Sequence, residues 1–440
     1  MRYVIGEFSL LKPYAINYYV SVYYITMSSK SSNTQKGLKQ RTISNGLNLV
    51  ESQLSTIYEG TKHDLLTIPC VSQISFGGQA TYKIQEKNIC LHDINIAFAM
   101  GALSGLTGGP ARFSNTNNWW HRCEIKQNGV VKQTILPTAN HLINQLFFSD
   151  EDRTLTNNLG GHYASTAQRV LMSSSANTYI LSLASLFNAT SLPILTSSHE
   201  VEVILFLNPL EDIVVRNGAT GTPTVQIFSS SVMSKITRMS QDIAESRLSN
   251  MAIQPEHSIF HTTKHTQYQV PTGSTTSQFV LNNLAGSKVA LMMFVVRPVA
   301  GLTGDGLTTY LPISSFTIRD AANTHITGGL EVTQAVSNFL AQYWVESTYN
   351  CETALTSGKN GIIYDSSAYV QLYSHSANIV DAFHRGRMNG SREYFGNESL
   401  FLSFKSGVSV PTVVDVYCLC EAVVQQTPTS VQVLEGSQLM

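Results

Sequence analysis

Charged side chains are scarce in this chain. Asp, Glu, Lys and Arg make up only 13% of its 440 residues, and the formal net charge is −1. A charge so close to zero gives the whole chain no electrostatic reason to bind nucleic acid or an anionic membrane. It also gives little repulsion between copies, which suits a protein that associates with itself.

Cysteine is too sparse to form a disulfide framework. The chain has six cysteines and no Cys-x-x-Cys pair, so a reducing compartment is the expected environment. Cys418 and Cys420 lie two residues apart, which places both thiols on one face of a strand. We interpret them as small core residues and not as a metal site.

A long uninterrupted apolar run is also missing. Residues 1–26 are apolar and aromatic-rich, but polar residues and a proline break them, and no signal-peptide cleavage pattern follows. Residues 28–41 are polar and weakly basic, which is typical of a solvated tail. We predict an N-terminal arm over residues 1–59, with Met27 as the expected true start. The alternatives are an arm ordered by a neighbouring subunit and an anchor on a membrane surface.

Sequence motifs of catalysis are lacking too. No Gly-x-Ser-x-Gly or His-Glu-x-x-His motif occurs. Gly301–Gly306 resembles a phosphate-binding loop, but it lacks the Gly-Lys-Ser/Thr ending. The sequence therefore predicts no enzyme activity, no cofactor, no metal and no small-molecule substrate.

What the chain does contain is short β-prone runs separated by Gly, Asn, Pro and Ser. This pattern predicts an all-β sandwich or barrel, and Asn128-Gly129 predicts a tight hairpin. The clearest runs are Ile94–Ala99, Cys123–Val131, Tyr179–Leu186, Glu200–Leu207 and Thr224–Ser230.

Thr178–Leu207 contains two of these runs, joined by a short crossover with Pro193. The pattern first suggests that the two runs are neighbouring strands of a sandwich. If they are late strands of one jelly roll, Leu192–Leu195 would connect its two sheets. Helical patterns are rare, and we expect covering helices at Lys235–Met251, Asp150–Leu155 and Val332–Tyr343.

Parts of the chain occur twice. Phe98–Gly109 and Phe294–Gly306 both run from a strand end into Gly-Leu-Thr-Gly, 196 residues apart. Pro223–Phe228 is similar to Pro411–Tyr417, 188 residues later. Two similar offsets in the same order predict one module used twice. Each module has the size of an eight-stranded jelly roll, with two four-stranded sheets and long loops.

Five residues stand out as candidate subunit-contact or loop residues. Trp119 and Trp120 close a long loop, where an aromatic pair serves as a packing anchor, a subunit contact or a platform for a sugar. His257, His261 and His265 are four residues apart, so a helix or a strand would place them on one face. They are interpreted as interface histidines at the junction of the modules, with a metal or pH-sensing cluster as the alternative.

A duplicated β-barrel metalloenzyme of the bicupin type is disfavoured. Such an enzyme needs a metal-binding His/Glu set inside each barrel. His92 and His121 have no histidine counterparts 196 residues later.

Several segments of the second half together form a pattern found in a known family. They are the Ser240–Asn250 helix, the strands from Glu256 to the Phe294-Val295-Val296-Arg297 step, the Gly390–Phe395 turn with Leu400–Phe404, the strand Thr412–Ala422 and the tail Val431–Gly436. In their order these segments resemble double jelly-roll major capsid proteins of double-stranded DNA viruses, of the nucleocytoplasmic large DNA virus, polinton-like virus and virophage type. The resemblance covers about the last two-thirds of the chain, and the family's Asn-Tyr-Asn near the C-terminus is replaced by Cys418–Ala422.

The resemblance implies two tandem eight-stranded jelly-roll β-barrels side by side, with a few short covering helices. Their expected ranges are 60–238 and 256–440, with an inter-barrel helix or linker at 239–255. Three copies would form a homotrimeric, pseudo-hexagonal capsomer that tiles an icosahedral shell.

The further partners implied are neighbouring capsomers, penton and minor capsid proteins, and an internal membrane or the genome through the N-terminal arm. The implied location is the virion capsid, assembled in the host cytoplasm or nucleus. The alternative function is a β-sandwich attachment or carbohydrate-binding protein with Trp119 and Trp120 as its platform.

Overall fold

The computed structural model describes most of the chain after residue 60, and every statement below concerns those residues. The described ranges are 61–148, 150–161, 165–183, 194–195, 200–299, 304–307, 310–327, 332–333, 336, 370–376, 379 and 390–436. The predicted arm at 1–59, with Met27, lies outside them, as do 184–193 and most of the predicted helix Val332–Tyr343.

The first half of the described chain forms two antiparallel sheets. One has the order β1-β14-β4-β9, with β3 beside β14 and β10 beside β3. The other has the order β2-β11-β7-β8. The strands are β1 (Thr61–Pro69), β2 (Gln79–Ile84), β3 (Ile89–Leu91), β4 (Ile94–Met100), β7 (Trp120–Gln127), β8 (Val130–Ile135), β9 (Asn177–Leu183), β10 (Ile194–Leu195), β11 (Val201–Leu207) and β14 (Ile227–Met239).

The second half repeats this arrangement. Its sheets have the orders β15-β23-β17-β20 and β16-β22-β18-β19, with β21 beside β17 and β24 beside β23. The strands are β15 (Glu256–Val270), β16 (Thr276–Val280), β17 (Ser287–Pro298), β18 (Ile313–Arg319), β19 (Val332–Thr333), β20 (Val370–Ser374), β21 (Arg392–Tyr394), β22 (Ser399–Phe404), β23 (Thr412–Gln426) and β24 (Val431–Glu435).

Both halves have the topology of a jelly roll. If the eight principal strands of each half are counted in chain order, one sheet pairs the first, eighth, third and sixth, and the other pairs the second, seventh, fourth and fifth. The predicted double jelly roll is therefore confirmed. The two sequence offsets join equivalent strands, since one relates the ends of β4 and β17 and the other relates the starts of β14 and β23.

Alternating side chains build the core of each jelly roll. In β4 every second residue from Ile94 to Met100 is buried, and in β11 Val201, Val203, Leu205 and Leu207 point inward as predicted. The Asn128-Gly129 hairpin is confirmed between β7 and β8, with positive φ at both turn residues. The first expectation for Thr178–Leu207 is wrong, because β9 and β11 lie in opposite sheets of the jelly roll and are not neighbours.

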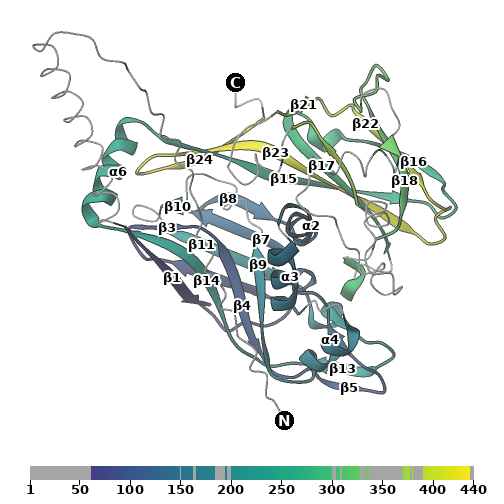
Figure 1. The fold of residues 1–440 in the computed structure, drawn as a ribbon, viewed down its shortest axis with the longest axis horizontal. Helices are drawn as coiled ribbons and strands as arrows, with labels where there is room; N and C mark the ends of the chain where they lie inside the picture. Colours follow the sequence, from purple (N-terminus) through teal and green to yellow (C-terminus); the bar gives the residue numbers. More distant parts are fainter. Residues whose placement is uncertain are drawn as a thin grey trace, which may run out of the picture. The chain divides into compact units, whose positions relative to one another are not determined.

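Three of the described helices lie in the connection between β8 and β9: α2 (Pro137–Phe147), α3 (Asp150–Leu159) and α4 (Thr166–Ser173). The helix predicted from Asp150 is confirmed and is longer than expected. The helix α6 (Gln241–Ile253) joins the two jelly rolls (Figure 1). The prediction of a helix from Lys235 is wrong for its first residues, because Lys235–Met239 continue β14 and pair with β1.

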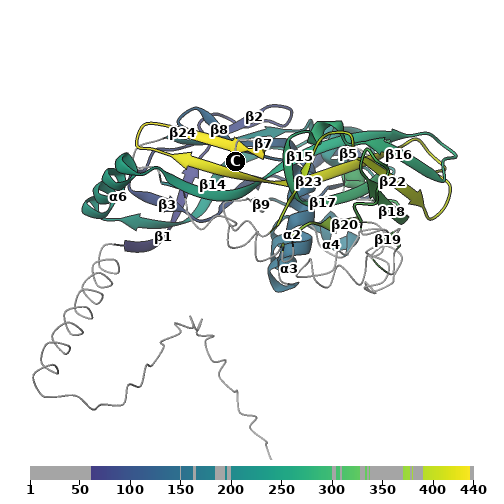
Figure 2. The same cartoon turned by 90° about the horizontal axis from the view of Figure 1, so that it is seen from above.

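Smaller elements complete the described chain. They are the pairs β5 (Ser104–Thr107) with β13 (Thr220–Thr224) and β6 (Arg112–Phe113) with β12 (Val214–Val215), the helix α5 (Leu210–Ile213), and the 3-10 turns η1 (Thr116–Asn118), η2 (Asn282–Leu284) and η4 (Gly304–Leu307). Figure 2 shows the two jelly rolls from above. No described helix is both long and apolar enough to cross a membrane.

Candidate functional site: the seam between the two jelly rolls

The paired tryptophans are core residues of the first jelly roll. Trp119 is fully buried among the rings of Phe76, Phe98, Phe113 and Tyr179, with centroid distances of 5.0–5.9 Å, and its Nε1 donates to the carbonyl of Ser114 at 3.0 Å. Trp120 is fully buried as well. Neither indole has an open face on which a sugar could stack, so the interpretation as a sugar platform is wrong. The packing-anchor interpretation fits Trp119.

The three predicted histidines lie on one strand, β15, and not on a helix. Residues four apart on a strand are separated by roughly 13 Å, which is too far for a shared metal ion. Within the described ranges no group of three or more His, Cys, Asp or Glu side chains is arranged to hold a metal. His257 is exposed, His261 is buried and His265 is hydrogen-bonded to Asp415, so the three side chains have three different environments.

The seam between the jelly rolls has an apolar core supplied by α2. Its side chains Leu142, Leu146 and Phe147 are buried in one cluster with residues of β17 and β23 from the second jelly roll. Pro137 suits the first position of this helix, where its missing N–H costs nothing. Burying each large apolar side chain contributes about 1.5–3 kcal/mol. The seam is therefore a continuation of the core and not a loose contact between domains.

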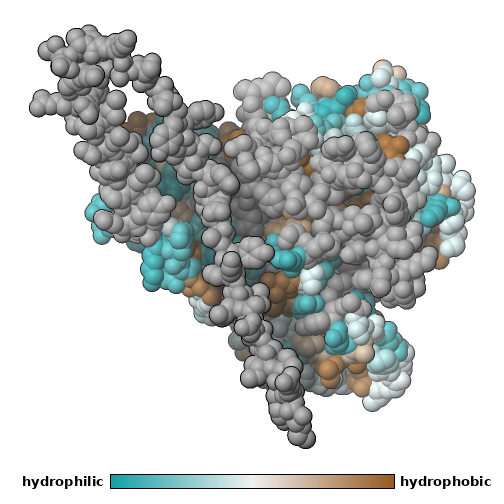
Figure 3. All heavy atoms as spheres, in the orientation of Figure 1, coloured by the Kyte–Doolittle hydropathy of each residue, from teal (hydrophilic) through white to brown (hydrophobic). Residues whose placement is uncertain are grey.

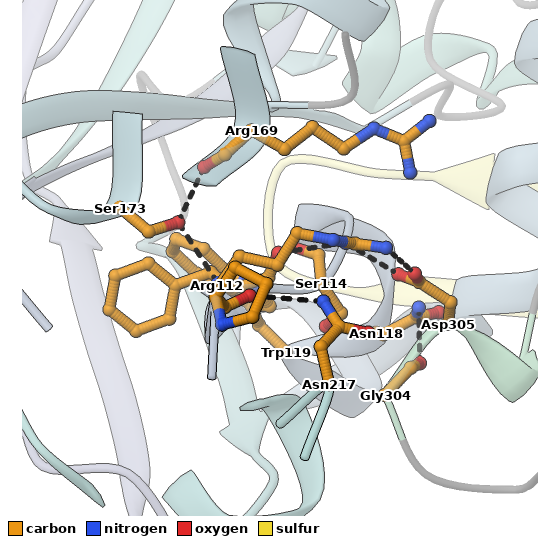
Figure 4. A network of polar contacts seen from close by, with 11 residues as sticks. Arg112, Ser114, Asn118, Trp119, Arg169, Ser173, Asn217, Gly304 and Asp305 are labelled. Atoms are coloured by element: carbon orange, nitrogen blue, oxygen red, sulfur yellow. Dashed lines mark hydrogen bonds and ion pairs between the residues drawn. The ribbon is translucent and has the colours of Figure 1, made fainter. Parts of the chain in front are cut away.

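A polar clasp joins the jelly rolls at a second point (Figure 4). The guanidinium of Arg112, on β6, forms a bidentate ion pair with Asp305 on η4. Asn118 Nδ2 donates to the carbonyl of Gly304 at 2.6 Å. Gly304 has φ +57, and a Cβ there would lie 3.2 Å from Val215 Cγ2 of the first jelly roll. Glycine at this position leaves room for the Val215 side chain of the first jelly roll.

Figure 4 also shows how the first jelly roll holds Arg112 in place. Ser173, at the end of α4, accepts a hydrogen bond from the backbone N–H of Phe113 at 3.0 Å and donates to the carbonyl of Arg169 at 2.9 Å. Asn217 Nδ2 donates to the carbonyl of Pro110 at 3.0 Å. The loop before β6 and the helix α4 thus fix β6, and with it the guanidinium that faces Asp305.

A cluster of buried charges lies on β15, β17 and β23. Asp415, which is fully buried, accepts hydrogen bonds from Arg297 Nε at 2.6 Å and His265 Nε2 at 2.8 Å. Burial alone would raise the pKa of Asp415, but the hydrogen bond from His265 and the charge of Arg297 outweigh it and hold that pKa below its usual value. The ring of His265 also stacks on Tyr417, with centroids 4.6 Å apart.

The helix α6 fixes the connection between the jelly rolls. Arg247 forms a bidentate pair with Glu256, at the start of β15, with N–O distances of 2.7 and 2.8 Å. Its third nitrogen donates to the thiol of Cys90, on β3, at 3.4 Å. At another point of the seam Asn128, at the tip of the β7–β8 hairpin, donates to the carbonyl of Thr429. These contacts connect the two jelly rolls.

Comparisons with known proteins identify the fold. No family model matches the sequence, and no curated protein matches it. A structure of the PBCV-1 virus capsid matches with a TM-score of 0.61 and 14% identity, covering 85% of this chain and 97% of that chain. The Faustovirus major capsid protein matches with a TM-score of 0.61 and 7% identity, covering 84% and 91%. A chain of the Sputnik virophage matches with a TM-score of 0.58 and 12% identity, covering 86% and 89%.

The chain has the double jelly-roll fold of viral major capsid proteins. The resemblance inferred from the sequence is thereby confirmed at the level of the fold.

Sequence reasoning missed most of the double jelly-roll seam. Nothing singled out Arg112, Asp305 or α2, since their contacts join residues far apart in the chain. One signal was present: Asp415 interrupts the apolar run from Val413 to Leu419. A carboxylate within a buried strand requires a partner, and Arg297 on the neighbouring strand supplies it.

Proposed function

We propose that this protein is a viral major capsid protein that forms homotrimeric, pseudo-hexagonal capsomers tiling an icosahedral shell. The observation that carries the proposal is the pair of jelly rolls with the same strand order, joined by a buried seam into one subunit. Three such subunits around a threefold axis present six similar jelly rolls, which approximate a hexagon. A closed shell can be tiled by such units.

The chemistry of the described residues supports a structural role. The charged groups of the seam form ion pairs, Arg112 with Asp305 and Arg297 with Asp415. On the face seen in Figure 3, hydrophobic residues of the described chain occur in small groups among hydrophilic ones. A subunit of a shell needs several contact surfaces and no catalytic centre, so we assign the protein a structural and not an enzymatic role.

We further propose domain limits of 60–238 and 256–440 around a linker at 239–255. They are supported by the start of β1 at Thr61, the end of β14 at Met239 and the start of β15 at Glu256. The arm at 1–59 would face the inside of the shell, near a membrane or the genome. Penton and minor capsid proteins would be additional partners, and assembly would take place in the host cytoplasm or nucleus.

Among the five candidate contact residues, His257 is the one we propose for contact between subunits, because it is exposed near the end of α6. Replacing it with Glu should weaken self-association while leaving the melting temperature of the isolated subunit unchanged. An unchanged association constant would remove His257 from the proposed interface.

Native mass spectrometry of the purified full-length protein tests the proposed assembly. The expected mass is three times the 48.3 kDa of the chain, and it should persist on dilution because trimer interfaces of shell proteins are large. A monomer at micromolar concentration would contradict the proposal.

A further inference from the structure

A cavity of about 250 Å³ lies at the seam, beside the N-terminus of α2. Its walls come from both jelly rolls: Trp120, Thr138 and Asp212 from the first, and His265, Arg297 and Tyr417 from the second. One water molecule occupies about 30 Å³ of liquid volume, so the cavity has room for an ion larger than water.

Two residues that line this cavity, one from each jelly roll, carry a buried hydrogen-bond donor without an acceptor among the described residues. Trp120 Nε1 and Arg297 Nη1 are both buried, and neither makes a hydrogen bond to another group of the described chain. Buried donors almost always have an acceptor in native proteins. Two such donors at one cavity point to an acceptor that the chain itself does not supply.

The N-terminus of α2 adds a third attraction for negative charge. The helix has eleven residues, and Leu136 at its N-cap makes no side-chain hydrogen bond to the first turn. The free N–H groups and the helix dipole at such an end favour anions.

We propose that this cavity binds a small oxyanion, of the size of sulfate or phosphate, which bridges the two jelly rolls. Its oxygens would accept hydrogen bonds from Trp120 Nε1, Arg297 Nη1 and the first turn of α2. Through these hydrogen bonds the ion would link the two jelly rolls of one subunit. The inference concerns a single subunit and does not depend on the proposed assembly into a shell.

The charges around the cavity set the conditions for binding. Arg297 is balanced by Asp415, and Asp212 is a carboxylate that opposes the binding of an anion. Removing the charge of Asp212 should therefore strengthen the binding of the oxyanion.

Titration calorimetry with sulfate on the full-length protein tests the proposal. The expected result is one saturable site per chain. Trp120→Phe keeps an aromatic ring but removes the N–H, and should weaken binding about tenfold. Asp212→Asn removes the opposing carboxylate and should tighten binding.

Arg238→Gln is the matched control, because Arg238 is a partly exposed arginine on β14 that pairs with Asp64 and Glu86 away from the cavity. It should bind sulfate as the wild type does, and circular dichroism checks that each variant is folded. The proposal is overturned if the wild type shows no saturable heat. It is equally overturned if Trp120→Phe and Asp212→Asn both bind sulfate with the affinity of the wild type.

Discussion

Replacing Leu142 with Ala should loosen the second jelly roll although Leu142 belongs to the first. The side chain lies on α2, is fully buried and packs in the cluster shared with β17 and β23. Leucine-to-alanine changes in a packed core cost about 2–5 kcal/mol, because apolar contacts are lost and a cavity remains. A loss of about 3 kcal/mol corresponds to a rise of roughly a hundredfold in the equilibrium constant for opening.

Hydrogen exchange measured by mass spectrometry locates this loss. Peptides from β17 and β23 should exchange faster in Leu142→Ala than in the wild type. The control is Leu205→Ala, which removes the same atoms from a fully buried position in the core of the first jelly roll. It should accelerate exchange mainly in β2, β7 and β11. Unchanged protection of β17 and β23 in Leu142→Ala would refute the idea that α2 locks the two halves together.

Three further variants test the buried polar groups. Arg112→Ala removes the ion pair with Asp305 in the seam and should cost about 3–5 kcal/mol in urea unfolding. Arg216→Ala, in a partly exposed pair, should cost less than about 1 kcal/mol, and equal losses would contradict the clasp. Burial lowers the pKa of His261 to about 4, below its usual 6.5. The unfolded chain therefore takes up this proton first as the pH falls, and stability should decrease between about pH 6.5 and pH 4. His261→Leu should reduce that decrease in melting curves at pH 7 and pH 5, and an identical pH dependence would exclude His261 as a cause. Glu398 is buried and accepts backbone N–H bonds from the turn at Phe395 and Gly396; Glu398→Ala should lower stability by about 1–3 kcal/mol in thermal unfolding, and no loss would show that the turn holds without it.

The strands were predictable because their signals are local. Alternation in Val201–Leu207 identifies the inward face of β11, and Asn128-Gly129 fixes the hairpin between β7 and β8. The repeated Gly-Leu-Thr-Gly and Pro-Thr-Val segments marked equivalent strands of the two jelly rolls. These features are patterns among residues close together in the sequence, so they can be recognised without knowledge of the fold.

The helices were less predictable, and for a physical reason. In α2 every residue from Thr138 to Phe147 is buried, including Asn140, His141, Asn144 and Gln145. A helix buried on all sides between two sheets shows no polar face, and its apolar periodicity is masked. In the opposite error, Ile236 and Met239 have helical spacing although they lie on β14, where pairing with β1 prevails over the local pattern.

The seam could not be predicted because its contacts are non-local. Arg112 and Asp305 are 193 residues apart, and the hydrogen bond from Asn118 to Gly304 spans 186. Each residue type is ordinary at its own position in the sequence. Only the packing of the two jelly rolls brings these residues together.

Electron microscopy of the purified full-length protein tests the central claim most directly. The claim predicts flat, pseudo-hexagonal particles with threefold symmetry and six similar densities, one for each jelly roll of three subunits. Particles with only two such densities, or without threefold symmetry, would contradict it.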